Sequence, residues 1–196
     1  MSKYPSERDC LRILTDAGCT KRVLVHCCTV RAVADEIAVK FVDADKELVT
    51  AGALLHDLGR AYDHSILHAM VGADMAKDLK LPNELVEIIR KHTGAGLDQQ
   101  DVDELNLPKG DYIPRTIEEK IVAHADNLVS DNRIVVHSFS SEKLRKKGSV
   151  RGADRLDALH KELSIQYGCD LDVMVDMLGE FPELRGPCSQ FGGKRF

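Results

Sequence analysis

The sequence has no tryptophan, and aromatic residues make up only 5% of its 196 residues. It also lacks an excess of basic residues, because 27 Lys and Arg stand against 32 Asp and Glu, which gives a net charge of −5. A chain with this balance has no broad positive field to hold a long nucleic acid by counterion release. We therefore expect a small ligand and no long nucleic-acid partner.

No apolar run approaches the roughly 20 residues that span a bilayer, and the first five residues have no hydrophobic signal core. The six cysteines show no Cys-x-x-Cys spacing, so we expect reduced thiols. These absences predict a cytoplasmic protein with no membrane partner. The length and the 43% of hydrophobic residues suit one well-packed globular domain.

What the sequence does contain is helical periodicity over most of its length. Hydroxyl or acidic side chains precede several apolar stripes, and glycine or proline stands near their ends. We expect helices at 6–17, 20–41, 45–57, 65–79, 82–92, 116–130, 153–167 and 171–178. Because no segment alternates as a strand does, the sequence predicts an all-α fold without a sheet.

Two segments have weaker patterns. Residues 93–115 form a long connection with several glycines and prolines, for which we expect a binding or covering role. Beyond residue 132 the periodicity fades, and we interpret the basic run at 143–147 as a solvated turn rather than a polyanion site. We also expect His137 and His160 to lie on the solvated surface.

Five of the eight histidines fall within residues 26–92. His26 shares an apolar helix face, which fits either a buried histidine with one hydrogen bond or a metal ligand. His56 and Asp57 follow an apolar run, and an imidazole beside a carboxylate suits a divalent cation. Asp126 lies on another apolar helix, where a carboxylate needs a cation or a helix–helix hydrogen bond to stay charged.

These residues stand in sequence blocks that resemble the HD-domain metal-dependent phosphohydrolase superfamily. The similar blocks are AGALLHDLGR at 51–60, LHAMVGA at 67–73, IIRKHT at 88–93 and EEKIVAHAD at 118–126. Within the superfamily the chain looks nearest to the two-metal branch of bacterial diadenosine tetraphosphate hydrolases, and more distantly similar to the HD domain of ribonuclease Y. The resemblance covers and implies an HD-domain helical bundle over 20–133. From the helical pattern outside it, we expect an N-terminal helix over 1–19 packed on this core, and a small C-terminal helical extension with a tail over 134–196.

The resemblance also implies a binuclear metal site. Its ligands would be His26, His56, Asp57, His68, His92 and Asp126. Asp57 would bridge two divalent ions and so be catalytic as well. Iron or manganese is favoured by analogy with the two-metal branch, with nickel, zinc or magnesium as alternatives.

The implied activity is hydrolysis of a phosphate ester or anhydride of a small nucleotide or phosphorylated metabolite, by attack of a metal-bound hydroxide. The alternatives are a phosphodiesterase acting on RNA or a cyclic nucleotide, and a non-catalytic nucleotide-binding regulator. Arg60 is a further catalytic candidate and substrate contact, and Lys91, His64 and Arg133 are candidate substrate contacts. We expect His124 to be structural, and the sequence predicts no oligomeric state.

Overall fold

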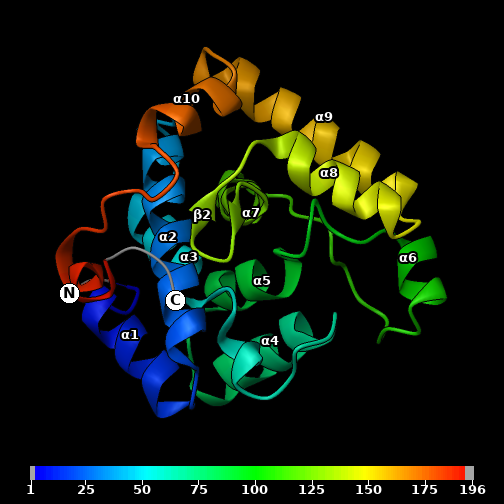
Figure 1. Ribbon diagram of the computed structural model, residues 1–196. Coiled ribbons are helices and arrows are strands. Elements are labelled where there is room, and N and C mark those ends of the chain that lie inside the picture. The colour runs from blue at the N-terminus through cyan, green and yellow to red at the C-terminus, as the bar shows by residue number, and fades with distance from the viewer. Residues whose placement is uncertain (1–2, 193–196) are drawn as a thin grey trace.

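The computed structural model describes residues 3–192 and confirms the all-α fold (Figure 1). Its helices are α1 (Glu7–Asp16), α2 (Lys21–Ala38), α3 (Lys46–Leu55), α4 (His68–Asp78), α5 (Asn83–Lys91), α6 (Gln99–Glu104), α7 (Ile117–Asn127), α8 (His137–Lys146), α9 (Val150–Tyr167) and α10 (Leu171–Leu178), with the 3-10 helices η1 (Leu58–Ala61) and η2 (Gly186–Phe191). Within this described part, no helix has the length and hydrophobicity needed to cross a membrane. The last four residues of the expected tail lie outside the described residues.

Several helices begin where a side-chain oxygen can accept hydrogen bonds from the first turn. The Thr20 hydroxyl caps α2, and the Asp45 carboxylate caps α3. Thr116 and Glu119 form a reciprocal capping box at the start of α7. These local signals explain why the predicted helices begin close to the observed ones, and they hold the three helices that lead into the candidate site.

The hydrophobic core lies among α2, α3, α5 and α7, which pack directly against one another. Its largest fully buried side chains include Ile37, Leu54, Ile89 and Ile121, one from each of these helices. The N-terminal helix α1 packs on α3, and α4 covers α5 and η1. All six cysteines belong to the described part and are free thiols.

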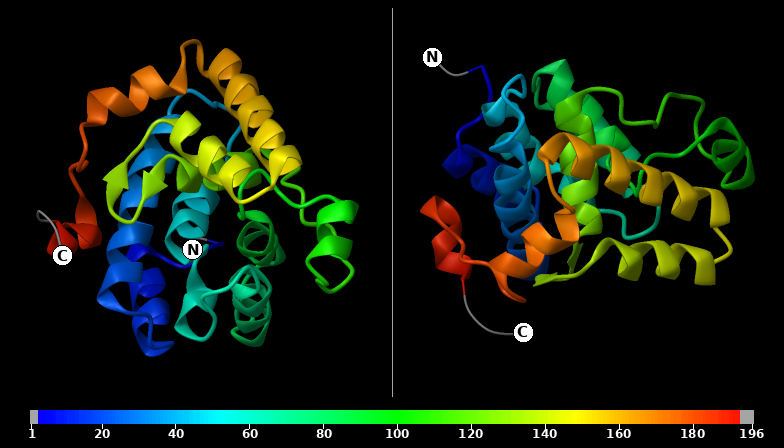
Figure 2. Two further views of the ribbon diagram at one scale, coloured as in Figure 1. Left: turned by 45° about the vertical axis from the view of Figure 1, so that its right-hand side comes forward. Right: turned by 90° about the horizontal axis from the view of Figure 1, so that it is seen from above.

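The region after residue 127 is more regular than the sequence predicts. Strands β1 (Val129–Ser130) and β2 (Arg133–Ile134) form a short antiparallel hairpin, so the expectation of no sheet is wrong at this point. Helix α8 occupies a segment for which no helix is predicted. Figures 1 and 2 show α8 and α9 as an antiparallel pair that extends from the bundle toward α6.

The long connection at 93–115 also contains structure that the sequence did not predict. Asp98 and Asp101 form a capping box that starts the short helix α6. Arg155 on α9 pairs with both carboxylates and donates to the carbonyl oxygen of Gly96. A small second core of Val102, Leu107 and Tyr112 supports the segment from within. These contacts attach the connection to α9.

Candidate metal centre

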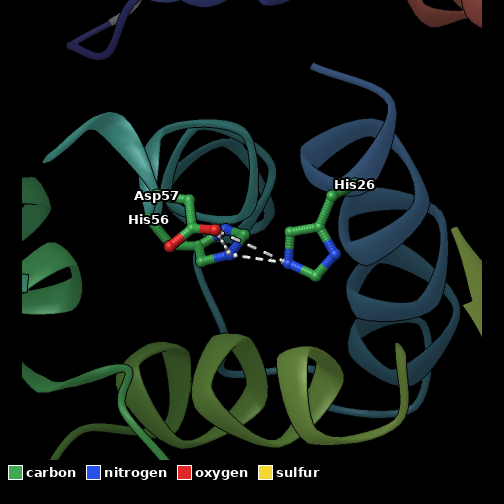
Figure 3. Close-up of side chains that lie close together, drawn as sticks. All are labelled: His26, His56 and Asp57. Atoms are coloured by element: carbon green, nitrogen blue, oxygen red, sulfur yellow. Dashed lines mark hydrogen bonds and ion pairs between the residues drawn. The ribbon is translucent and has the colours of Figure 1, made fainter. Parts of the chain in front are cut away.

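The six ligands implied by the sequence come together from separate elements around the middle of the bundle. They are His26 on α2, His56 and Asp57 at the end of α3, His68 at the start of α4, His92 at the end of α5, and Asp126 on α7. Figure 3 shows His26 from α2 facing His56 and Asp57 across the site. Four of the six stand at helix ends, where the chain turns and side chains can converge.

The first set of ligand atoms contains two imidazoles and two carboxylates. The Asp126 Oδ1 atom lies 3.0 Å from His26 Nε2 and 3.5 Å from His56 Nε2. Both of these nitrogens lie 3.8 Å from Asp57 Oδ2. Ligands held about 2.1 Å from a shared divalent ion are about 3.0–3.5 Å apart, so these atoms can surround one cation with a small inward adjustment.

The second set uses the other oxygen of the same Asp57 carboxylate. Asp57 Oδ1 lies 3.2 Å from His68 Nε2 and 3.6 Å from His92 Nε2. These two nitrogens are 3.0 Å apart. One carboxylate therefore contributes an oxygen to each of two adjacent ligand sets, and both sets consist of residue types that hold first-row divalent metals.

The second nitrogen of each imidazole explains why the facing atoms suit a cation. All four Nδ1 atoms lie within hydrogen-bond distance of backbone carbonyl oxygens, His26 with Asp131 at 2.7 Å, His56 with Ala53 at 2.8 Å, His68 with Ser65 at 2.6 Å and His92 with Ile89 at 2.7 Å. Because a carbonyl oxygen only accepts, each neutral imidazole carries its proton on Nδ1 and presents a lone pair at Nε2. Lone pairs then face lone pairs and carboxylate oxygens, an arrangement that a bound cation satisfies.

The electrostatics of the cluster follow from burial and close charges. Burial alone lowers the pKa of His26, but the hydrogen bond and charge of Asp126 outweigh it and raise that pKa to about 9. Without a cation, the Nε2 atom of His26 therefore holds a proton at neutral pH, and a bound cation would replace that proton. Burial raises the pKa of Asp126, yet hydrogen bonds with His26 and His56 hold it well below its usual range. Burial lowers the pKa of His92. The site thus keeps an ionised carboxylate inside the protein, where a positive partner is needed.

Two glycines bring η1 and α4 into backbone contact beside the site. A Cβ atom at Gly59 would lie 1.9 Å from the carbonyl oxygen of His68 and 2.6 Å from the backbone nitrogen of Gly72. Only a residue without a side chain permits this approach. The close contact places Asp57, two residues before Gly59, next to His68 at the start of α4.

Arg60 and His64 lie where the sequence analysis expects substrate contacts, in the lining of a cavity that opens onto the ligand atoms. The Arg60 Nε atom donates to Asp57 Oδ1 at 3.1 Å, and Nη1 donates to the His64 carbonyl oxygen at 2.9 Å. These two contacts orient the guanidinium at the edge of the centre. Arg60 can therefore reach both the ligand carboxylate and an anion in the cavity.

Lys91 and Arg133 do not lie in this cavity. Lys91 is buried and pairs with Glu87 and Glu119, each at 3.2 Å. Arg133 is exposed and pairs with Glu180 at 3.4 Å. Both side chains are thus engaged away from the ligand atoms, and their predicted substrate contacts receive no support from this geometry.

Three further histidines form a separate cluster outside the centre. His124 is fully buried, its Nε2 atom lies 3.1 Å from His160 Nδ1, and burial lowers its pKa to about 3. The rings of His137 and His160 stack with centroids 3.7 Å apart. The expectation of a solvated surface is wrong for His160, which is buried, because α8 and α9 pack together over it.

The cavity has a volume of about 600 Å³ and includes residues that the sequence analysis did not select. Phe139 and Lys143 on α8 and Lys147 at its C-cap line it, although the basic run at 143–147 was interpreted as a solvated turn. The signal in the sequence is their spacing of four residues, which places all three on one helix face. Without a predicted helix, that spacing carried no information.

Comparisons with known proteins agree with this geometry. The HD domain family model matches residues 23–131, more than half of the chain. The chain is 44% identical to a protein named tRNA (cytidine(56)-2'-O)-methyltransferase from Picrophilus torridus over 87% of its own residues, and it spans 50% of that protein's length. The chain is also 29% identical to ribonuclease Y of Finegoldia magna. This match covers 79% of the chain and 28% of that protein.

Among solved structures, the chain resembles the HD domain of the phosphodiesterase PgpH from L. monocytogenes in complex with cyclic-di-AMP. The TM-score is 0.58 at 18% sequence identity, and the match covers 87% of this chain and 96% of the other. At this identity the similarity concerns the fold, and it agrees with the helical bundle built from the sequence. The family match includes the positions of His26, His56, Asp57 and Asp126. We conclude that the chain belongs to the HD domain family.

Proposed function

We propose that this chain is a metal-dependent phosphohydrolase that cleaves a phosphate ester or anhydride of a small nucleotide. The observation that carries the proposal is the Asp57 carboxylate, whose two oxygens each face a separate set of imidazole Nε2 atoms. His26, Asp57 and Asp126 line a cavity large enough for a nucleotide-sized molecule, and the second ligand set lies buried behind Asp57. Membership of the HD domain family supports the same class of chemistry.

The donor set also bears on the metal. Four neutral imidazoles and two carboxylates favour iron, manganese, nickel or zinc over magnesium, which prefers an oxygen shell. We propose two ions of iron or manganese, with Asp57 shared between them. When bound, such ions supply positive charge that polarises a phosphoryl group and makes water more acidic.

The residues of the chain divide the remaining tasks. The neutral imidazoles hold position without cancelling positive charge, because their Nδ1 protons are held by carbonyl oxygens. Asp57 and Asp126 supply the negative charge that retains the cations. Arg60, oriented by Asp57 and the His64 carbonyl, presents donors toward the cavity and binds the non-bridging oxygens of the substrate.

A second candidate substrate is an RNA phosphodiester. The relatives from Picrophilus torridus and Finegoldia magna both have names that refer to RNA, and the chain covers only part of each. A phosphodiester linkage is chemically within reach of the same centre, because its scissile phosphorus is attacked in the same way. The two candidates differ in the length of chain that the cavity must accept.

The proposal is tested by an activity screen. The protein, loaded with manganese or with iron under anaerobic conditions, is expected to hydrolyse at least one member of a panel of mononucleotides, dinucleotides, cyclic nucleotides and short RNAs. Chromatography of the products identifies the bond that is cleaved. Absence of hydrolysis across the panel, or methylation of a tRNA transcript without phosphate chemistry, contradicts the proposal and favours a regulatory or methyl-transfer role.

Metal content provides an independent prediction. Protein purified without nickel resin and then loaded with manganese should hold about two ions per chain, as two adjacent ligand sets require. His68→Ala should reduce the content to about one, because it removes a ligand from the second set only. His64→Ala, which lies at the cavity but outside both sets, serves as the matched control and should retain two. A content of one that is insensitive to His68→Ala rules out the second ion.

A further inference from the structure

We propose that α8 forms a binding wall for a second phosphate group, so that the substrate is a nucleotide with a further phosphate next to the one that is cleaved. This inference rests on the proposed function and adds the substrate class. Helix α8 lies outside residues 23–131, which the family model matches, and yet it lines the same cavity as His26, Asp57 and Asp126. Its side chains therefore lie outside the family match.

Two side chains of α8 and one from its C-cap residue line the cavity together. Phe139, Lys143 and Lys147 are four residues apart and line it along one face of the helix. The Phe139 side chain remains 43% exposed, so its ring is accessible. An accessible aromatic ring next to two ammonium groups is the combination that stacks a base and binds a phosphate.

The basic residues at 143–147 fall into two groups, one that lines the cavity and one that pairs with carboxylates elsewhere. Arg145 pairs with Asp154 at 2.8 Å and with Asp157 at 2.7 Å, and Lys146 pairs with Glu142 at 4.0 Å. Lys143 and Lys147 form no ion pair with a carboxylate of the described residues 3–192. The two lysines that face the cavity are thus the two whose charge is available to a ligand.

The acidic side chains of the opposite wall have other partners. Asp131 is the acidic side chain of the cavity nearest to α8 in the sequence, and it already pairs with Arg22. The hydrogen bond from Arg22 lowers the pKa of Asp131, and the charge of Lys143 acts in the same direction. Asp57 and Asp126 belong to the ligand sets. Because these carboxylates already have partners, the ammonium groups of Lys143 and Lys147 can bind an anionic ligand.

The dimensions favour more than one phosphate. The cavity volume of about 600 Å³ lies within the range of sites for molecules larger than a single phosphate ester. The metal ligands and Arg60 provide one anion site at the base, and the two lysines provide another along α8. A mononucleotide phosphate at the centre leaves the second site without a partner, whereas a phosphorylated dinucleotide occupies both.

The test compares dinucleotides that differ by one phosphate. For the manganese-loaded protein, the value of kcat/KM for pUpU or for UpUp is expected to exceed that for UpU by at least tenfold. In Lys143→Ala/Lys147→Ala this preference should fall below about threefold. Lys146→Ala changes the same charge on the outer face of α8 and should retain it. Because the lysines are exposed, the preference should also weaken as salt increases.

A preference near one for both phosphorylated dinucleotides in the wild-type protein overturns the inference, as does a preference that survives the double replacement. Calorimetric binding of pUpU, UpUp and UpU to the manganese-loaded protein separates this result from the activity itself. If none is cleaved but a phosphorylated dinucleotide binds at least tenfold more tightly than UpU through the two lysines, the inference stands and the proposed hydrolysis fails. Equal binding in the wild-type and double-variant proteins overturns the inference without reference to turnover.

Discussion

Replacing Asp57 by Asn is expected to lower kcat/KM on the order of 10³-fold or more, which corresponds to about 4 kcal/mol of transition-state stabilisation. The reason is geometric, because the two carboxylate oxygens of Asp57 face different ligand sets at 3.2–3.8 Å. Asparagine has one acceptor oxygen and an amide that donates, so one set loses its ligand atom while the size of the side chain is kept. Steady-state kinetics and metal analysis of the same preparation measure both effects.

The matched control is Asp43→Asn, the same chemical change at an exposed position away from the site. It should leave kcat/KM and metal content as in the wild-type protein, and circular dichroism of both variants should show an intact helical fold. If Asp57→Asn keeps two ions and full turnover, Asp57 does not bridge. If turnover is lost with two ions retained, the carboxylate acts on the substrate and not through the metals.

Gly59→Ala is expected to lower the free energy of unfolding by about 3 kcal/mol, or the melting temperature by roughly 6–12 °C for a chain of this size. The added Cβ atom would meet the His68 carbonyl oxygen at 1.9 Å, so the backbones of η1 and α4 must separate. Overpacking against backbone is costly because no rotamer change relieves it. Since the displaced backbone carries His68, metal binding at the second set should weaken as well. Thermal unfolding with and without manganese measures both.

Gly110→Ala provides the comparison for this prediction. A Cβ atom there would lie 3.4 Å from the Tyr112 ring, and the backbone of Gly110 is not in the left-handed region. The free energy of unfolding should therefore change by less than about 0.5 kcal/mol. Equal stability of Gly59→Ala and Gly110→Ala would show that η1 and α4 are not held in contact.

The predicted helices are those whose signals are local. A side-chain cap at Thr20, Asp45 or Thr116 followed by an apolar stripe can be identified in the sequence, and the observed helices begin within a residue of these positions. Helix α8 has no such signal. Its N-cap Val136 offers no side-chain oxygen, and the first amide is instead capped by Asp172, 35 residues further along the chain. That contact exists only after α10 has packed nearby.

The residues of the candidate site also differ in how far the sequence predicts them. The six ligands were grouped through resemblance to a family, and the structure brings the atoms of all six within reach of shared cations. Lys91 was selected because it precedes His92, but neighbouring residues on a helix point in different directions, and Lys91 turns toward Glu87 and Glu119. The lysines of α8 were missed because their place at the cavity depends on tertiary packing.

The hairpin formed by β1 and β2 has a consequence for how sequences of this kind can vary. Its turn residue Asp131, in the left-handed region with φ of 59°, holds the Nδ1 proton of His26 through its carbonyl oxygen, and β2 leads directly into α8. Substitutions on the cavity-facing side of α8 can alter what is bound and leave the ligands in place. An insertion or deletion in the hairpin would disturb the ligands, because it moves the Asp131 carbonyl oxygen that orients His26. Diversity at this cavity should therefore take the form of exchanged side chains, with the length of the hairpin held constant.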